Sequence, residues 1–331
     1  MKKIKLGVAA LALLGITTAL TACNSKQKVV IYSSMEDYTL ELLQKRLDEK
    51  FPSYNVVIEY MSTSNIATKV IEEGANSDCD IVFGEEYGYT EKMIAAGVLD
   101  SIEGDYDISK YVDDAVPATV NKYALPCCRT GGGIILNTSV LASKGLSKPT
   151  SYNDLLDPAY KGLVSMASPK SSGTGYMFFY SLVKAWGEEK ALKFFDDLTP
   201  NVLAYTTSGS GPVNALVNRE VAVGFGMLSQ AVTKINDGNK ELEITFFEEG
   251  APYNLYANVI VKGKKQRQCV KDVMDYLDAS FTNESNELYY PEPVIKNAKY
   301  NIPNFPTNIK YADMTGNNLT NKEALLAKWS H

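Results

Sequence analysis

The sequence predicts an α/β protein of two lobes, in which each lobe is a central sheet flanked by helices. Its 331 residues, 45% of them hydrophobic and 22% charged, supply a large apolar core and enough chain for two domains. Between residues 29 and 96, a β-rich run is followed by a helical run three times. A second set of alternating elements begins after the glycines at 131–133. Alternation of this kind favours sheets with helices on their faces.

The first lobe is predicted over residues 29–126, with a return segment over approximately 255–310. Strands are expected at 29–32, 56–60 and 80–83. The first helix follows from the spacing of Leu40, Leu43 and Leu47 and ends at Pro52. Further helices are expected from the cap residue Ser64 to Gly74, and near 90–96. Three consecutive βα units predict a parallel sheet.

The second lobe is predicted over residues 127–254. Its elements in order are a short helix at 151–156, a strand at 163–167, a long helix at 176–198, a strand at 202–205, a helix at 212–218, and strands at 221–224 and 242–247. A strand at 256–261 is expected to return to the first lobe, followed by a helix at 266–281. The last helix, at 321–329, is expected to pack back across the lobes.

Charge and histidine content argue against several functions. The net charge is −6, and it becomes more negative without Lys2, Lys3 and Lys5, so no nucleic-acid partner is expected. The single histidine, His331, is the last residue. Ser-His-Asp catalysis, Cys-His catalysis and histidine-based zinc sites are therefore not expected. We expect no catalytic residue, no cofactor and no metal site.

The amino terminus predicts export and lipid attachment. Residues 1–22 combine a basic start, an apolar stretch from Leu6 to Leu20 and small residues before Cys23, which is typical of a signal peptide. The run from Leu20 to Cys23 resembles a bacterial lipobox, which implies that Cys23 carries acyl chains. Residues 23–28 then form a polar tether. We expect a protein outside the cytoplasm, anchored by lipid to the bacterial cell membrane.

Two loops of the second lobe combine hydroxyl side chains with glycines. They lie at 169–176 and 205–212, and each follows a strand and opens a helix. Free backbone N–H groups at a helix start, together with glycines that permit close approach, favour an anion. Capping and turning alone would also explain such loops. The nucleotide-binding P-loop pattern is absent.

These features together resemble the extracellular solute-binding proteins of ABC importers. The resemblance covers residues 29–329 and is carried by the lipobox, the two α/β sets, Asp80 to Phe83, and the segments at 172–176 and 208–212. The branch it most resembles is the type II group that contains ferric-ion, aminoethylphosphonate and sugar-phosphate binding proteins. The resemblance implies a type II periplasmic-binding-protein-like fold with a hinge between the lobes, a small-molecule ligand held between them, and delivery to a membrane permease by a monomer.

The ligand is expected to be a small anion, namely a phosphonate or phosphate ester, and zwitterionic members of these classes are included. Arg129 is a candidate partner for its anionic group, and Glu85 for a cationic group, although a carboxylate beside a simple phosphate would repel it. The expected ligand-binding residues are Ser33, Ser34, Glu85, Arg129, Ser172, Gly173, Thr174, Ser208, Gly209 and Ser210.

Three alternatives remain open from the sequence. Iron, free or as a chelate, is the first, but Phe225-Gly226-Met227 stands where ferric-binding relatives carry adjacent tyrosines. The pair Tyr289-Tyr290 lies near the carboxyl-terminal helices, where packing is expected. An exported carboxylate-dependent enzyme is the second alternative, and a surface adhesin the third.

Overall fold

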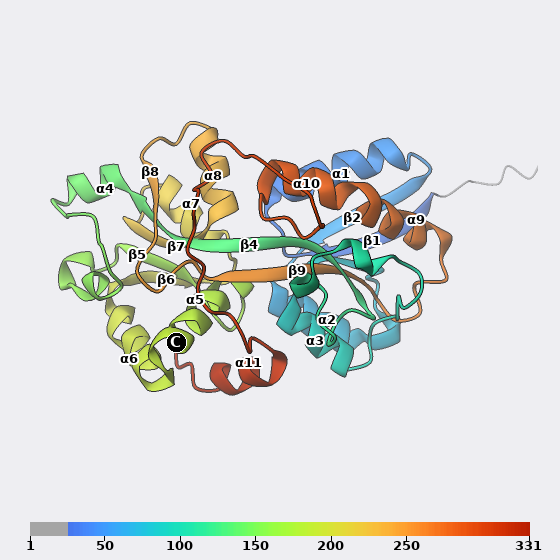
Figure 1. Cartoon of the computed structure of the whole chain (residues 1–331), viewed down its shortest axis with the longest axis horizontal. Helices are drawn as coiled ribbons and strands as arrows, with labels where there is room; N and C mark the ends of the chain where they lie inside the picture. The colour runs from blue at the N-terminus through green and yellow to red at the C-terminus, as the bar shows by residue number, and fades with distance from the viewer. Residues whose placement is uncertain (1–25) are drawn as a thin grey trace, which may run out of the picture.

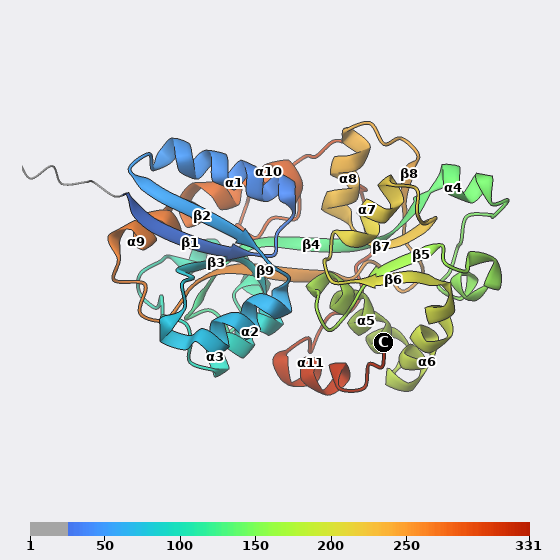
Figure 2. The same ribbon diagram turned by 180° about the vertical axis from the view of Figure 1, so that it is seen from behind.

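The computed structural model of the chain describes residues 26–331. The predicted signal peptide and the lipidation site at Cys23 lie outside the described residues. Figures 1 and 2 show two lobes side by side, joined by the long strands β4 (Ala124–Asn137) and β9 (Tyr253–Ile260). We call lobe 1 the part built on β1 to β3 and lobe 2 the part built on β5 to β8.

Lobe 1 is built on three parallel strands with helices on both faces. Valine and isoleucine runs form the strands because branched side chains pack well on a pleated surface. The strands are paired in the order β2-β1-β3, and β3 pairs antiparallel with β9. The elements are β1 (Gln27–Ser33), α1 (Asp37–Lys50), β2 (Tyr54–Tyr60), α2 (Thr63–Glu73), β3 (Ile81–Glu86), α3 (Tyr87–Ala95), α9 (Gln268–Tyr276) and α10 (Thr282–Tyr289).

Lobe 2 repeats this plan with strands in the order β4-β7-β5-β6, while β8 pairs with β4. Its elements are α4 (Thr138–Ser143), β5 (Val164–Ala167), α5 (Gly173–Trp186), α6 (Glu188–Leu198), β6 (Val202–Thr206), α7 (Gly211–Val217), β7 (Val223–Met227), α8 (Leu228–Asn236) and β8 (Leu242–Thr245).

Strand β4 belongs to both lobes. Its first half, from Ala124 to Gly131, pairs antiparallel with β9, and its second half, from Gly132 to Asn137, pairs with β7 and β8. Because the two crossing strands are hydrogen-bonded to each other, the lobes share one continuous sheet. A rotation of one lobe against the other must therefore bend β4 and β9.

Buried hydrophobic side chains cover both faces of the sheet in each lobe. In lobe 1 one cluster includes Ile31 and Phe83, and another includes Val30 and Val82, as the alternation of a strand requires. In lobe 2 the larger cluster includes Phe225 and the carboxyl-terminal Trp329. The chain end therefore forms part of the lobe 2 core.

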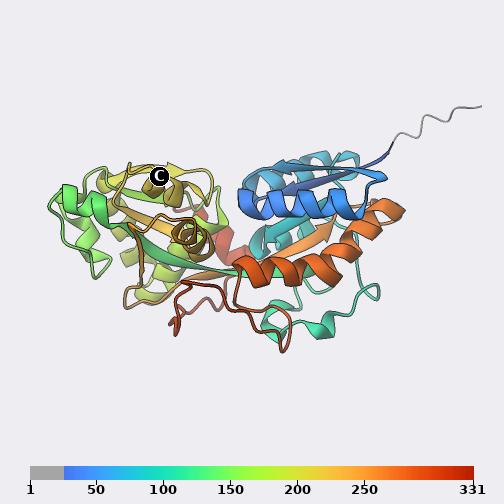
Figure 3. The same ribbon diagram turned by 90° about the horizontal axis from the view of Figure 1, so that it is seen from above.

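The last part of the chain crosses from one lobe to the other. After α10, it runs along one face of the molecule past the junction of the lobes, as Figure 3 shows from above. Near its end it forms α11 (Leu319–Leu326), which lies between α3 and α5 in Figure 1.

Several predicted boundaries were wrong. The single helix predicted at 176–198 is two helices, α5 and α6, because Gly187 between them has a φ of +84°, which interrupts helical geometry. Strand β3 continues through Glu85 and Glu86, which were predicted to lie in a loop. The cap residue of α2 is Ser62, and the predicted cap, Ser64, lies within the first turn.

Within residues 26–331, no helix combines the length and the apolar character needed to cross a membrane.

Candidate functional site

A cavity lies between the lobes where strands end and helices begin. Lobe 1 contributes the loop between β1 and α1 and the loop between β2 and α2. Lobe 2 contributes the loops before α5 and α7, and the strands β4, β7 and β9 complete the wall. In open α/β sheets, ligands bind at such strand ends. The lining residues are Ser34, Met35, Glu36, Tyr60, Ser62, Thr63, Thr130, Ser172, Gly173, Thr174, Gly209, Met227 and Tyr256.

The lobes are closed around this cavity. About 20 Å³ can hold the centre of a water molecule, which is room for about one water. The hydroxyls of Thr63 and Ser64 donate to the carbonyl of Ser171 at 3.3 and 3.2 Å, and the Tyr89 hydroxyl donates to the carbonyl of Lys170 at 2.9 Å. A solute larger than water therefore requires the lobes to stand further apart than in this structure, both to enter and to remain bound.

Two helices begin at the cavity, one from each lobe. Ser172 caps α5, and its Oγ accepts a hydrogen bond from the N–H of Thr174 at 3.2 Å. Ser62 stands at the cap position of α2, but its side chain makes no capping hydrogen bond. The first N–H groups of a helix lack intrahelical partners and carry partial positive charge. In the closed protein the N–H of Gly173 donates to Oγ1 of Thr63 at 3.2 Å and the N–H of Ser64 donates to the carbonyl of Ser171 at 3.5 Å. An anion at either helix start would replace these acceptors.

Two buried hydroxyls on the cavity wall have no partner. Ser62 Oγ and Thr130 Oγ1 belong to side chains that are 9% and 3% exposed, and neither makes a hydrogen bond within the described residues. An unpaired buried hydroxyl costs about 1–3 kcal/mol, and such groups are rare in folded proteins. A polar solute between the lobes would satisfy both hydroxyls.

Glycine is required where the two loops of lobe 2 meet. A Cβ on Gly209 would lie 2.4 Å from Oγ1 of Thr174, which is closer than real Cβ atoms approach, and 3.1 Å from Oγ of Ser172, which is a tight contact. Gly209 does not have a positive φ, so space and not backbone conformation demands glycine here. This contact holds the loop before α7 against the start of α5.

Glu36 is the one charged side chain among the described residues that line the cavity. It is 7% exposed, and burial raises the pKa of its carboxyl to about 7, while a hydrogen bond from the hydroxyl of Tyr290 to Oε2 at 3.1 Å lowers it. The Tyr290 hydroxyl also contacts Oγ1 of Thr39 at 3.0 Å. Glu36 can therefore accept a hydrogen bond from a solute as a carboxylate, or donate one when protonated, near neutral pH.

The family model for bacterial extracellular solute-binding proteins matches residues 32–279. The chain belongs to this family. The match spans both lobes, from the end of β1 into the helices that follow β9. Members of the family bind small solutes outside the cytoplasm and deliver them to ABC permeases.

Two relatives are similar to the chain in sequence. The solute-binding protein is 29% identical over 294 residues to an uncharacterized protein of Haemophilus influenzae, covering 84% of this chain and 82% of the relative. It is 24% identical over 145 residues to the phosphoglycerate transport regulatory protein PgtC of Salmonella typhimurium, covering 44% of this chain and 36% of that relative.

A solved structure shows the same fold over nearly the whole chain. The periplasmic binding protein AfuA from Actinobacillus pleuropneumoniae, with exogenous fructose-6-phosphate bound, superposes with a TM-score of 0.80 and 26% identity. The superposition covers 92% of this chain and 98% of AfuA. The predicted two-lobed α/β fold of the solute-binding protein is thereby confirmed.

Half of the residues predicted to bind the ligand line the cavity. Two more, Ser208 and Ser210, lie beside the lining residue Tyr60. Ser208 Oγ is hydrogen-bonded to the Tyr60 hydroxyl and, at 2.8 Å, to Ser210 Oγ. These hydroxyls are therefore already paired in the closed protein. The predicted residues on the cavity wall are Ser34, Ser172, Gly173, Thr174 and Gly209.

Three predicted residues lie away from the wall. Ser33 Oγ donates to the carbonyl of Phe83 at 2.7 Å and so fastens β1 to β3. The Arg129 guanidinium pairs with Asp114 at 2.5 Å. Glu85 is fully buried in β3, its carboxyl oxygens have no partner among the described residues, and burial raises its pKa well above the ordinary value. Glu85 therefore does not offer a carboxylate to the cavity.

Sequence reasoning missed residues on the same loops and on the crossing strands. Glu36 directly follows the predicted serine pair after β1, so the sequence placed it within reach of the site. Ser62 follows β2, a strand end that was not considered. Thr130 and Tyr256 lie on β4 and β9, and only the pairing of these crossing strands brings them to the cavity.

Proposed function

We propose that this solute-binding protein captures a small solute with a phosphate or phosphonate group between its lobes, and that it is anchored to the membrane through Cys23. The observation that carries the proposal is the pair of unpartnered hydroxyls, Ser62 Oγ and Thr130 Oγ1, at the junction where α2 and α5 begin.

Charge in the cavity supports an anion bound without basic side chains. Among the described residues that line it, none is Lys, Arg or His. The positive potential comes from the starts of α2 and α5, where N–H groups and the hydroxyls of Ser62, Ser172 and Thr174 can donate to phosphoryl oxygens. Hydrogen bonds to an ionised acceptor contribute about 1.5–3 kcal/mol each, and helix N-termini favour anions.

Glu36 indicates what the other end of the solute carries. A second anionic group beside its carboxylate would be repelled, whereas an ammonium or hydroxyl group would donate to it. The cavity therefore suits an aminophosphonate or a hydroxylated phosphate ester better than a simple phosphate. Glu36 takes the role that the sequence assigned to Glu85.

Two of the similar proteins agree in substrate chemistry. AfuA is described with fructose-6-phosphate bound, and PgtC is named for phosphoglycerate transport. Each compound joins a phosphate ester to one or more hydroxyl groups, and phosphoglycerate also carries a carboxylate. An anion-binding wall that faces Glu36 fits the sugar phosphate better, because the Glu36 carboxylate would repel a second anionic group.

Iron is the second candidate, since the phenols of Tyr60 and Tyr256 and the carboxyl of Glu36 line the cavity. Tyrosinate is the form that binds ferric ion, but burial raises the pKa of both tyrosines. Within residues 26–331, no group of three or more His, Cys, Asp or Glu residues is arranged to hold a metal. These observations favour the phosphoryl solute.

Calorimetric titration with a panel of solutes tests the proposal. We expect binding of 2-aminoethylphosphonate or fructose 6-phosphate, and weaker or no binding of inorganic phosphate and of 3-phosphoglycerate, whose carboxylate Glu36 would repel. Ser62→Ala and Thr130→Val should each lower the affinity for the solute about tenfold, because the loss of about 1.4 kcal/mol of binding free energy is a factor of ten. Ser143→Ala is the matched control, since its Oγ donates to the carbonyl of Val140 on α4, away from the cavity. Failure of every phosphorylated or phosphonylated solute to bind would reject the proposal.

A further inference from the structure

The carboxyl-terminal segment is anchored in the core of lobe 2. Trp329 is buried, and its ring centroid lies 5.1 Å from that of Phe179 and 5.0 Å from that of Phe195. Nearby, Nζ of Lys328 pairs with Glu188 of α6 at 2.6 Å. Large aromatic side chains dominate the energetics of such cores, so Trp329 fastens this end of the segment to lobe 2.

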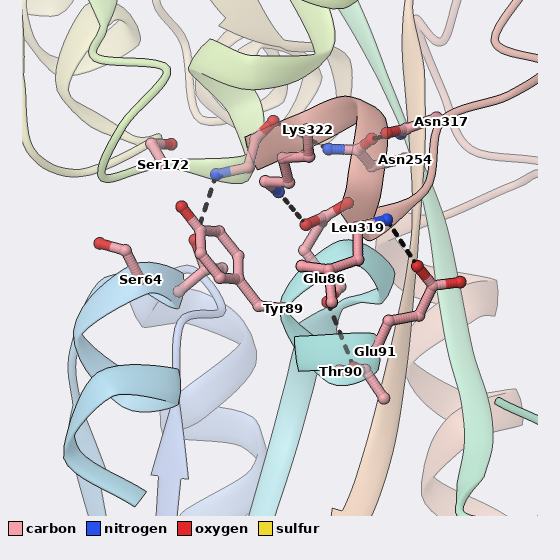
Figure 4. A network of polar contacts seen from close by, with 12 residues as sticks. Ser64, Glu86, Tyr89, Thr90, Glu91, Ser172, Asn254, Asn317, Leu319 and Lys322 are labelled. Carbon is pink, nitrogen blue, oxygen red and sulfur yellow. Dashed lines mark hydrogen bonds and ion pairs between the residues drawn. The ribbon is translucent and has the colours of Figure 1, made fainter. Parts of the chain in front are cut away.

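Seven residues before Trp329, the same segment is bound to lobe 1. Lys322 of α11 forms an ion pair with Glu86 at the end of β3, and both side chains are buried. Figure 4 shows the two side chains pointing toward each other, and beside them the carboxylate of Glu91, which accepts the N–H of Leu319 at 2.7 Å. Lys92 of α3 also pairs with Glu323 at 3.5 Å. Helix α11 thus lies between the lobes and contacts both.

The buried ion pair also touches the wall of the binding cavity. Nζ of Lys322 lies 3.9 Å from the ring centroid of Tyr89 in lobe 1 and 4.4 Å from that of Tyr176 in lobe 2. A Cβ placed on Gly173, which lines the cavity, would lie 3.1 Å from Cγ of Glu86. The stem of Glu86 therefore packs against the start of α5, where the cavity wall is formed.

We propose that Lys322 and Glu86 form an interlobe clasp that holds the two lobes in the closed arrangement, with both acting as positioning residues for capture. The proposal requires that the lobes open and close, and it does not depend on which solute is bound. When the lobes are closed, the ion pair is dry and flanked by two aromatic rings. When they open, α11 leaves with lobe 2, and the two charges separate into water.

The environment of the pair makes the clasp reversible. Two charges in a dry site attract strongly, but each has lost its hydration, so the net gain from the pair is modest. Removing one partner leaves the other charge buried and unpaired, which strongly disfavours the closed state and leaves the open state, where that charge is hydrated, nearly unaffected. The population of open protein is therefore the quantity that a single substitution must change.

Distance measurement between spin labels on the mature full-length protein tests the clasp without any solute. Labels at Glu72→Cys in α2 and Lys193→Cys in α6, both exposed positions, report the separation of the lobes. Lys322→Met and Glu86→Gln should each raise the open population about tenfold or more. The double variant should return toward wild type, because it leaves no unpaired buried charge.

Lys328→Met is the matched control. It removes the same charge from the same segment, but its partner, Glu188, belongs to lobe 2, so the lobe separation should not change. Glu91→Ala provides a second variant outside the core, which should shift the distance in the same direction by less. Unchanged distances in the Lys322, Glu86 and Glu91 variants would overturn the proposal, and so would an equal shift in Lys328→Met. Failure of the panel solutes to bind would reject the proposed function and leave these distances valid.

Discussion

Glu36 and Tyr290, which are 254 residues apart in sequence, meet beside the cavity through a hydrogen bond of 3.1 Å. The bond joins the start of α1 to the end of α10, so an early and a late segment of lobe 1 together form one polar contact beside the cavity. The Glu36 carboxyl stays protonated to a higher pH than an exposed carboxyl does, because burial raises its pKa to about 7.

This pKa makes the stability of the protein depend on pH. Because the pKa in the folded state lies above that in the unfolded chain, the folded state binds the Glu36 proton more tightly, and its stability falls as pH rises from about 4.5 to about 7. The full effect is roughly 3 kcal/mol, from 1.36 kcal/mol per unit. Glu36→Gln, which cannot ionise, should match wild type at pH 5 and melt several degrees higher at pH 8. An equal difference between the two proteins at both pH values would show that Glu36 is not protonated in the folded state.

The stretch from β1 to α3 illustrates what local pattern can predict. Val29 to Tyr32 forms a strand, and Leu43 and Leu47 form a buried helix face, because spacing along the chain decides each element. The same reasoning failed at Glu85, because the strand continues three residues beyond its predicted end and so buries a side chain that a loop would expose. The length of a strand depends on the strand with which it pairs, and the partner of β3 here is β9, which lies far away in the sequence.

The site was predictable only where it is built from one loop. Ser172 to Thr174 and Gly209 lie on the cavity wall because short loops at strand ends keep their local geometry. Thr130 reaches the wall through the pairing of β4 with β9, and Tyr290 through packing of α10. Neither relationship leaves a signal in a single sequence, and the pairing of Lys322 with Glu86 is of the same kind.

Gly209 should be required for binding because of space. In Gly209→Ala, the new Cβ would lie 2.4 Å from Oγ1 of Thr174 and would displace the start of α5. Gly211→Ala is a matched control, since its Cβ would lie 2.4 Å from Oγ1 of Thr206, away from the lining residues. Both variants should lose about 1–3 kcal/mol of stability through overpacking. In calorimetric titrations, Gly209→Ala alone should lose about tenfold or more in affinity. Equal affinities of the two variants would show that the loop at Gly209 is not part of the binding site.

Attachment to the membrane should depend on Cys23. If Cys23 carries the acyl chains, Cys23→Ala should leave the precursor uncleaved at that site and without lipid, while wild type partitions into detergent. Mass spectrometry of the intact protein measures both outcomes. Lipid on the variant would contradict the assignment.

Ferric ion should not produce a tyrosinate complex. Burial raises the pKa of Tyr60 and Tyr256, and Met227 lines the cavity at the end of β7. Wild-type protein mixed with ferric ion and bicarbonate should therefore develop no visible tyrosinate-to-iron absorption band. A strong band that disappears in Tyr256→Phe would move iron ahead of a phosphorylated solute.

Proton exchange on binding should reveal the chemistry of the solute end that meets Glu36. An ammonium group beside the carboxyl would lower its pKa, so at pH 7 the site would release protons when 2-aminoethylphosphonate binds. A hydroxylated ester such as fructose 6-phosphate brings negative charge without a cation, which would raise the pKa and cause proton uptake. Because the carboxyl is close to half-ionised at pH 7, either change should approach half a proton per site.

Titration calorimetry in buffers of different ionisation enthalpy counts these protons. The phosphoryl or phosphonyl group also titrates near neutral pH, with a second pKa of about 6 for a phosphate ester, so the count in wild type includes the solute. Glu36→Gln removes the contribution of the site and keeps that of the solute, and the difference between the two proteins isolates Glu36. Release with the aminophosphonate and uptake with the sugar phosphate are the expected signs. Identical proton counts in wild type and Glu36→Gln would mean that the solute does not approach this carboxyl. Only the hydroxyls of Ser62 and Thr130 would then indicate which solute binds.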